Sequence, residues 1–83
     1  MAIEIKLIGF GDDRPPRFGR QNSLSLEIET PASPWSLLRE LGIDDVTGLV
    51  IMDADSVIPL DRWQDAIVED GARLTLLSAF EGG

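Results

Sequence analysis

Cysteine and histidine are both absent from these 83 residues. Their absence excludes disulfides, thiolate nucleophiles, imidazole bases and the zinc or iron–sulfur sites that are built on those ligands. Acidic pairs do occur, Asp53 with Asp55 and Asp61 with Asp65, but no calcium-loop pattern surrounds them, so we expect solvated carboxylates and no metal site. A chain this short also buries only about 60% of the surface that it exposes when unfolded. The sequence therefore predicts a protein that is not itself an enzyme.

Long apolar segments and basic residues are also scarce. No stretch approaches the roughly 20 apolar residues of a membrane span, and the first residues lack a signal-peptide pattern, so we expect no membrane association and a cytoplasmic location. Seven basic residues against fifteen acidic ones give a formal net charge of −8. Such a surface repels phosphate backbones, which argues against a nucleic-acid partner. The charge either favours a partner with a basic docking face or serves solubility alone.

The first part of the chain predicts two strands joined by a long loop. Residues 3–7 alternate apolar and charged side chains, as does the segment around Leu24, Leu26 and Ile28, and this period of two is typical of strands with one buried face. Between them, residues 9–22, from Gly9 to Asn22, are rich in glycine and proline and hold three of the seven basic residues. We expect an antiparallel hairpin with an unusually long connection.

A short helix is predicted over residues 34–41. Ser33 suits the N-cap position, and Pro34 then falls on the first helical residue, where its missing N–H costs nothing. The leucines at 37, 38 and 41 share one face, with Trp35 flanking them. Gly42 suits the left-handed position that ends a helix, after which Ile43 folds back onto the last turn.

The remaining residues predict three more strands. Residues 49–52 form an apolar run typical of a buried strand, and residues 57–60 suggest a brief edge strand that tolerates Pro59. Trp63 and Ile67 are expected to cover one end of the core. Residues 69–71 indicate a turn, and residues 72–79 alternate as a last strand. The order strand, strand, helix, strand, short strand, strand predicts an α+β protein with one mixed sheet and one main helix packed across one face, the ubiquitin-like β-grasp arrangement.

We expect the β-grasp domain to span residues 1–79 and residues 80–83 to form a flexible C-terminal tail that ends in two glycines. Glycine has no Cβ, which suits a tail that threads a narrow channel, although the glycines are also compatible with a frayed end or a truncation site. The order of elements, the turn at residues 69–71, the strand that follows it, the helix end at residues 37–42 and the ending Phe80-Glu81-Gly82-Gly83 resemble the MoaD/ThiS family of ubiquitin-like sulfur-carrier proteins.

The resemblance implies a protein cosubstrate without a cofactor of its own. In that family an activating enzyme uses ATP to adenylate the terminal glycine carboxylate, here that of Gly83, and sulfur then replaces AMP to give a thiocarboxylate. The implied partners are this activating enzyme and a synthase that accepts the sulfur. Gly82 is expected to thread the partner's channel. Phe80 either packs on the core or anchors a partner, Glu81 is solvated or pairs with a basic channel mouth, and Arg73 forms a salt bridge or a docking contact.

The loop at residues 9–22 departs from the family pattern. Proteins of the MoaD type often carry an aromatic, alanine- and arginine-containing stretch there, whereas this chain has Gly9-Phe10-Gly11-Asp12-Asp13-Arg14-Pro15-Pro16. ThiS proteins usually have a tighter hairpin. Both departures weaken the assignment to molybdopterin or thiamine synthesis, and they leave open another pathway, such as tungsten-cofactor or sulfur-amino-acid synthesis.

Two other functions fit the same sequence. A ubiquitin-like modifier would join Gly83 to lysines of target proteins and leave Gly-Gly remnants there. A non-covalent β-grasp binding module would keep its function after removal of Gly82 and Gly83, whereas both covalent functions would be lost. For all three, the exposed side of the sheet is the expected partner surface, because apolar patches with polar rims mark binding sites.

Overall fold

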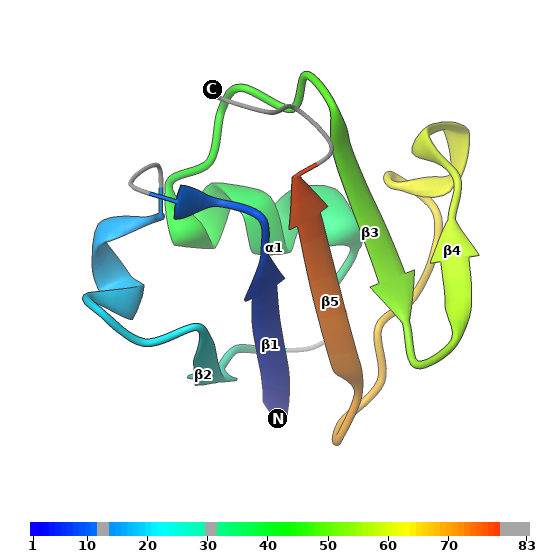
Figure 1. Cartoon of the computed structure of the whole chain (residues 1–83). Helices are drawn as coiled ribbons and strands as arrows, with labels where there is room; N and C mark the ends of the chain where they lie inside the picture. Colours follow the sequence, from blue (N-terminus) through cyan, green and yellow to red (C-terminus); the bar gives the residue numbers. More distant parts are fainter. Residues whose placement is uncertain (12–13, 30–31, 79–83) are drawn as a thin grey trace.

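The computed structural model describes residues 1–11, 14–29 and 32–78, and the elements follow one another in the predicted order (Figure 1). The strands are β1 (Ala2–Ile8), β2 (Ser23–Glu27), β3 (Leu49–Asp53), β4 (Ser56–Ile58) and β5 (Arg73–Ser78). The α-helix is α1 (Pro34–Leu41), and the 3-10 helices η2 (Pro16–Phe18) and η3 (Leu60–Arg62) lie in the described connections. The strands form one mixed sheet with α1 across one face, so the predicted fold class is confirmed.

The order of strands in the sheet is β2-β1-β5-β3-β4. The two central strands, β1 and β5, run parallel, and every other neighbouring pair is antiparallel. The predicted hairpin of β1 with β2 is present, with Ile3 opposite Leu26 and Ile5 opposite Leu24. The chain therefore places its first and last strands side by side in the centre of the sheet, and α1 provides the connection between the two hairpins.

The helix α1 begins and ends where the sequence predicted, because its caps are specific. The Ser33 hydroxyl accepts a hydrogen bond from the Ser36 amide at 3.3 Å, and the Ser36 hydroxyl accepts one from the Ser33 amide at 2.9 Å. This reciprocal pair is a capping box with serine at the third helical position. At the other end, Gly42 is left-handed with φ of 79°, and the Ile43 amide donates to the Leu38 carbonyl at 2.9 Å.

The core lies between α1 and the face of the sheet that α1 covers. It holds one or more side chains from β1, β2, β3, β5 and α1, together with three from the connections. The members are Ile3, Ile5, Leu7, Phe18, Leu26, Leu37, Leu38, Leu41, Ile51, Trp63, Val68, Leu74 and Leu76. No polar or charged residue is buried in the described part of the chain. The predicted helix face and the predicted inward positions of β1 are thus confirmed.

One predicted core residue is wrong. Ile67 is 71% exposed, and its neighbour Val68 is buried at 2%. The Val68 amide donates to the Ala32 carbonyl at 2.9 Å in an isolated antiparallel bridge. Successive side chains of an extended segment point in opposite directions, so the bridge that turns Val68 inward turns Ile67 outward. Trp63 does cover the core, and its ring packs edge-on against Trp35 with 5.4 Å between ring centroids.

Two strand boundaries, the burial of one strand and the role of one loop also differ from the prediction. The edge strand is residues 56–58, and Pro59 precedes η3 instead of lying in the strand. In β3 only Ile51 is fully buried, since α1 covers one face of the sheet and leaves the other open. The last strand begins at Arg73, one residue later than predicted, and the predicted end at Ala79 lies outside the described residues. The long loop is not merely a connection, because it carries the buried Phe18 into the core.

Candidate functional site

The predicted site residues of the tail, Phe80, Glu81, Gly82 and Gly83, lie outside the described residues. The structure instead shows the end of β5, from which residues 79–83 continue. Gly9, with φ of 78°, lies against this end, and a Cβ on Gly9 would come within 2.8 Å of the Ser78 carbonyl oxygen. Such a distance is a steric overlap. The first turn after β1 is therefore fitted closely to the last described residue of β5.

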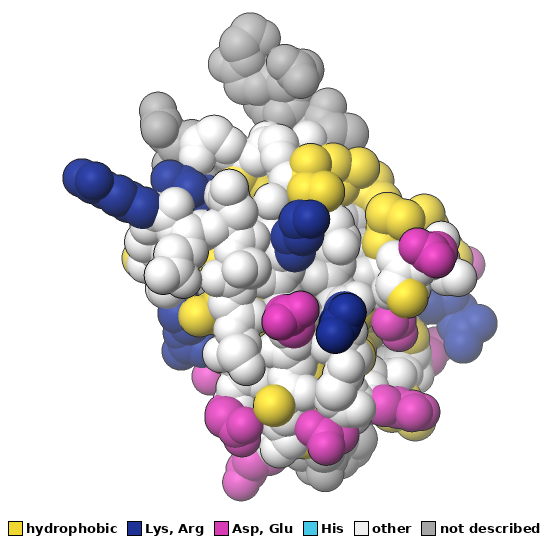
Figure 2. All heavy atoms as spheres, turned by 60° about the horizontal axis from the view of Figure 1, so that its bottom comes forward, with side chains coloured by type: hydrophobic (Ala, Val, Ile, Leu, Met, Phe, Trp, Pro, Cys, Tyr) yellow, Lys and Arg dark blue, Asp and Glu magenta, His cyan; other side chains and the backbone are white. Residues whose placement is uncertain are grey.

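The face of the sheet opposite α1, which we call the helix-free face, changes character along β5. On one side of β5, the register with β1 places Glu4 beside Arg73, Lys6 beside Thr75 and Ile8 beside Leu77. On the other side, the register with β3 places Met52 beside Thr75 and Val50 beside Leu77. Charged side chains thus accompany the start of β5, and apolar ones accompany its end. Figure 2 shows this separation, with hydrophobic side chains gathered to one side of the lysine, arginine and acidic side chains.

The apolar patch on this face consists of Ile8, Val50, Met52, Val57 and Leu77. Val57 lies opposite Met52 on the edge strand β4, and its side chain is 58% exposed, while Ile8 is 44% exposed. Side chains of this kind, next to one another and rimmed by polar groups, mark surfaces that bind other proteins. The patch lies at the end of the sheet where β5 finishes, so a protein that covers it would also stand beside the segment that follows Ser78.

Arg73 lies away from that end. Its Nε is 3.8 Å from a carboxylate oxygen of Glu4 on β1, and its side chain is 83% exposed. The rise of a strand separates Arg73 from Ser78 by about 17 Å along β5. The structure therefore gives Arg73 the salt-bridging role that was one of its two predicted roles. An exposed pair of this kind contributes little to stability.

The long first loop is held in place close to the end of β5. Arg14 donates from Nη1 to the Arg20 carbonyl at 2.9 Å and to the Asn22 side-chain oxygen at 3.0 Å. Together with the buried Phe18, these bonds give the loop a definite shape. A shallow depression lies between this loop and the connection that follows α1, and Arg14, Asp45 and Ser78 are among the residues that line it.

Hydrogen bonds from Thr47 hold the pKa of the Asp45 carboxyl below its usual value. The backbone amide of Thr47 donates to the Asp45 carboxylate at 3.0 Å, and the Thr47 side chain adds a second hydrogen bond that favours the charged form. Asp45 is fully exposed, and the short turn that it closes is structural. Among the described residues there is no group of three or more side chains that could hold a metal ion. None of their helices is long and apolar enough to span a membrane.

The sequence predicts a partner surface on the exposed side of the sheet but does not identify the residues of that surface. The signal was present, because Ile8 occupies an outward position of β1, in step with Glu4 and Lys6, where the alternation calls for a polar side chain. Val50 and Met52 flank the buried Ile51 in the same way. The strand order brings these three residues and Leu77 together, and alternation within one strand carries no information about that order.

Comparison with known proteins supports the fold. No protein-family model and no curated protein matches the chain. Among solved structures, the chain resembles the crystal structure of SAMP1 from Haloferax volcanii with a TM-score of 0.69 and 13% sequence identity. The match covers 100% of both chains. At this identity the likeness shows a shared ubiquitin-like β-grasp fold, and it does not test the resemblance to MoaD and ThiS proteins.

Proposed function

Starting from a chain with the ubiquitin-like β-grasp fold, we propose that the protein is a cosubstrate, a sulfur carrier whose reactive group is the carboxylate of Gly83. The observation that carries the proposal is the position of the diglycine. Gly82 and Gly83 follow β5, the last strand of the sheet, after only residues 79–81. The apolar patch and the end of β5 lie at the same end of the sheet. A docked partner would thus stand at the end of β5, five residues along the chain from the group on which it acts.

The chemistry belongs to the partners and needs no catalytic group from this chain. A carboxylate is a poor electrophile, so an activating enzyme first joins the Gly83 carboxylate to AMP and releases pyrophosphate from ATP. A persulfide then attacks the carbonyl carbon with its terminal sulfur and expels AMP. A thiol then attacks the persulfide donor's sulfur of the resulting S–S bond and forms a disulfide with it, so that the thiocarboxylate is released on Gly83. This division of labour agrees with a chain that contains neither cysteine nor histidine. The thiocarboxylate is then consumed by a sulfur-accepting synthase in cofactor synthesis of the molybdopterin, tungsten-cofactor or thiamine type.

The activating enzyme is proposed to dock on the apolar patch. The patch is apolar at its centre, whereas the rest of the helix-free face carries Glu4, Lys6 and Arg73. Interfaces of this kind derive most of their affinity from a few well-covered apolar or aromatic side chains. The roles of Gly82, Phe80 and Glu81 in the partner's channel belong to the same proposal. The same proposal includes a chain without a cofactor of its own and a cytoplasmic location.

The test is intact-mass analysis of the protein after incubation with ATP, a sulfur source and an extract of its native host. The first reading establishes whether Gly83 is the last residue. We then expect a species heavier by the difference between one sulfur and one oxygen, located on Gly83 by fragmentation. A variant with one alanine added after Gly83 serves as the matched control and should stay unmodified. Equal modification of both proteins, or none of the unaltered one, would contradict the proposal and leave a protein modifier or a non-covalent binding module.

The docking surface has its own matched pair of variants. Val57 in the patch and Ile67 outside it are both exposed β-branched residues, at 58% and 71%. Val57→Asp should lower the rate of thiocarboxylate formation by about tenfold, the equivalent of about 1.4 kcal/mol of lost binding. Ile67→Asp makes the same change of charge and should leave the rate unchanged. Equal rates for the two variants would move the docking surface away from the patch.

A second candidate function is that of a protein modifier, and the likeness to SAMP1, a ubiquitin-like small archaeal modifier protein, favours it. Here the activated Gly83 carboxyl is transferred to a lysine amine and forms an isopeptide bond as AMP leaves. Because Glu81 precedes the diglycine, a protease that cuts after glutamate leaves Gly82 and Gly83 on the modified lysine. Mass spectrometry of such digests should find these remnants for a modifier and none for a carrier alone.

A further inference from the structure

The two edges of the sheet differ in how far they are closed. At the β4 edge the Trp63 indole Nε1–H donates to the Ile58 carbonyl at 2.9 Å, and η3 follows directly. At the other edge, β2 pairs with β1 on one side alone. The Leu7 amide donates to the Asn22 carbonyl, and the Ile28 amide donates to the Met1 carbonyl. Even-numbered residues of β2 therefore turn their backbone groups toward β1.

The odd-numbered residues of β2 point their backbone amides and carbonyls away from β1, because alternate residues of an antiparallel strand form hydrogen bonds on opposite sides of the strand. The outward residues are Ser23, Ser25 and Glu27. Within the described ranges, no hydrogen bond reaches the backbone amides and carbonyls of these three residues. An edge with free donors and acceptors is a template for pairing with another extended chain.

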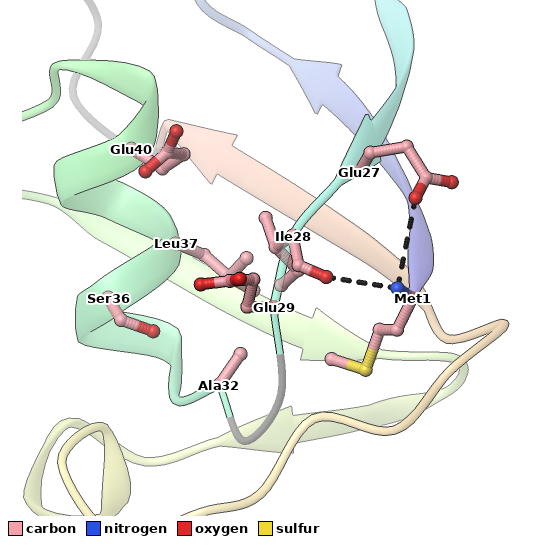
Figure 3. Close-up of a pocket in the computed structure, with 8 residues that line it drawn as sticks. All are labelled: Met1, Glu27, Ile28, Glu29, Ala32, Ser36, Leu37 and Glu40. Atoms are coloured by element: carbon pink, nitrogen blue, oxygen red, sulfur yellow. Dashed lines mark hydrogen bonds and ion pairs between the residues drawn. The ribbon is translucent and has the colours of Figure 1, made fainter.

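A groove runs beside this edge, between the end of β2 and α1 (Figure 3). Its floor is apolar, with Ala32 and Leu37 buried and Ile28 half-buried. Its rim carries the carboxylates of Glu29 and Glu40, whereas the Glu27 side chain points away from α1 (Figure 3). We call this the edge groove, and its volume is about 930 Å³.

The cations near the edge groove do not neutralise the negative charge of its carboxylates. The Met1 amino group donates to the Ile28 carbonyl at 3.0 Å and lies 3.8 Å from the Glu27 carboxylate. Arg17 lies 3.9 Å from Glu40. Glu29 has no charged partner among the described residues. Among the described residues, Arg17 is thus the one ion-pair partner of the two rim carboxylates, in a chain with a net charge of −8, which favours a basic occupant.

We propose that the edge groove docks an extended segment of a partner protein that has an apolar centre and basic flanks. The segment pairs with the outward backbone groups of β2 and adds a strand to the sheet. Its alternate side chains then point to the helix side, where an apolar one covers Ile28 and Leu37, and its lysines or arginines lie beside Glu29 and Glu40. Backbone pairing provides affinity, and the apolar floor and the carboxylates provide selectivity. This surface is separate from the apolar patch, so the proposal does not depend on the proposed function.

The test uses the full chain labelled with ¹⁵N and an acetylated, amidated peptide, Lys-Lys-Val-Ile-Val-Ile-Lys-Lys. Titration should shift amide resonances of residues 23–29 and 36–40 and leave those of the apolar patch in place. A peptide N-methylated at alternate residues of its apolar centre loses the donors that face β2, so it should bind weakly or not at all. A peptide with glutamate in place of lysine should also fail. Shifts centred on the apolar patch, or equal binding of the N-methylated peptide, would overturn the proposal.

Matched protein variants separate the carboxylates of the groove from the overall charge. Glu29→Lys combined with Glu40→Lys should weaken the peptide by roughly tenfold, as expected when two exposed attractions are replaced by repulsions. Asp55→Lys combined with Glu69→Lys makes the same change of net charge at exposed positions outside the groove and should leave affinity nearly unchanged. Equal weakening by both pairs would overturn the assigned site. Shifts of residues 23–29 that grow with protein concentration without peptide would assign the edge to a second copy of the chain and overturn the proposal.

Discussion

At the scale of single residues, Gly9, which directly follows β1, is constrained both in its backbone and in its surroundings. Gly9 combines φ of 78° with a close approach to the Ser78 carbonyl oxygen. Gly11, two residues later, has φ of 56° but nothing within 4 Å of where its Cβ would be. The two glycines therefore share the backbone requirement and differ in the steric one. They form a natural pair for measuring what the contact with β5 contributes.

We expect Gly9→Ala to destabilise the protein more than Gly11→Ala does. A left-handed conformation costs a residue with a side chain about 1–2 kcal/mol, and this cost applies to both variants. Only at Gly9 must the backbone also move, because the new Cβ would meet Ser78 at 2.8 Å. Urea denaturation of both variants measures the difference in unfolding free energy. Equal losses would mean that the turn and the end of β5 separate without cost.

Single-residue burial was predictable where a regular period operates and unpredictable where it does not. In β1 the apolar residues Ile3, Ile5 and Leu7 alternate with charged ones, and this alternation alone predicts that their side chains point into the core. Phe18 and Val68 lie in connections, where no period exists. The side that each occupies is decided by tertiary contacts, such as the bridge between Val68 and Ala32. The same limit explains why Ile67 was placed in the core in error.

At the scale of elements, α1 was predicted to the residue because its signals are local. Ser33 and Pro34 mark the start, Gly42 marks the end, and the leucines between them share a face. The strand β4 lacks such signals. Three residues are too few for a period, and Pro59 is compatible with the end of a strand as well as with a place inside an edge strand. Its true boundary follows from pairing with β3, which lies outside any local window.

Leu41→Ala tests how much the packing of α1 contributes. Leu41 is 3% exposed in the last turn of the helix. Truncation of a buried leucine removes transfer free energy and leaves a cavity, so we expect a loss of about 2–5 kcal/mol in unfolding free energy. Arg39→Ala on the exposed side is the control and should be nearly neutral. Chemical denaturation measures both, and a neutral Leu41→Ala would mean that the helix face is assigned wrongly.

At the scale of the whole molecule, the order of elements predicted the fold class, and the position of each strand did not follow from it. The parallel pairing of β1 with β5 joins segments about seventy residues apart, and no sequence period reports it. The apolar patch depends on the same pairing, because it places Ile8 beside Leu77. The candidate partner surface was therefore predictable as a face and not as a set of residues.

This pairing predicts that the described sheet unfolds in one step. Neither β1 nor β5 can leave without opening the centre of the sheet, so no part of it remains stable alone. Trp35 and Trp63 report the helix side through fluorescence, and far-UV circular dichroism reports the backbone. We expect both signals to give the same denaturation midpoint, as two-state unfolding requires. Separate midpoints would indicate that the two hairpins lose structure independently.

The parallel arrangement of the central strands also has a mechanical consequence. Because β1 and β5 are parallel, the first residue of β1 and the last residue of β5 lie at opposite ends of the sheet. A force that pulls residue 2 and residue 78 apart therefore acts along the two strands in opposite directions. The hydrogen bonds between the two strands are then loaded in shear and share the load, instead of opening one after another as in a zipper. A machine that unfolds proteins by pulling on one end would meet its main resistance at this pair of strands.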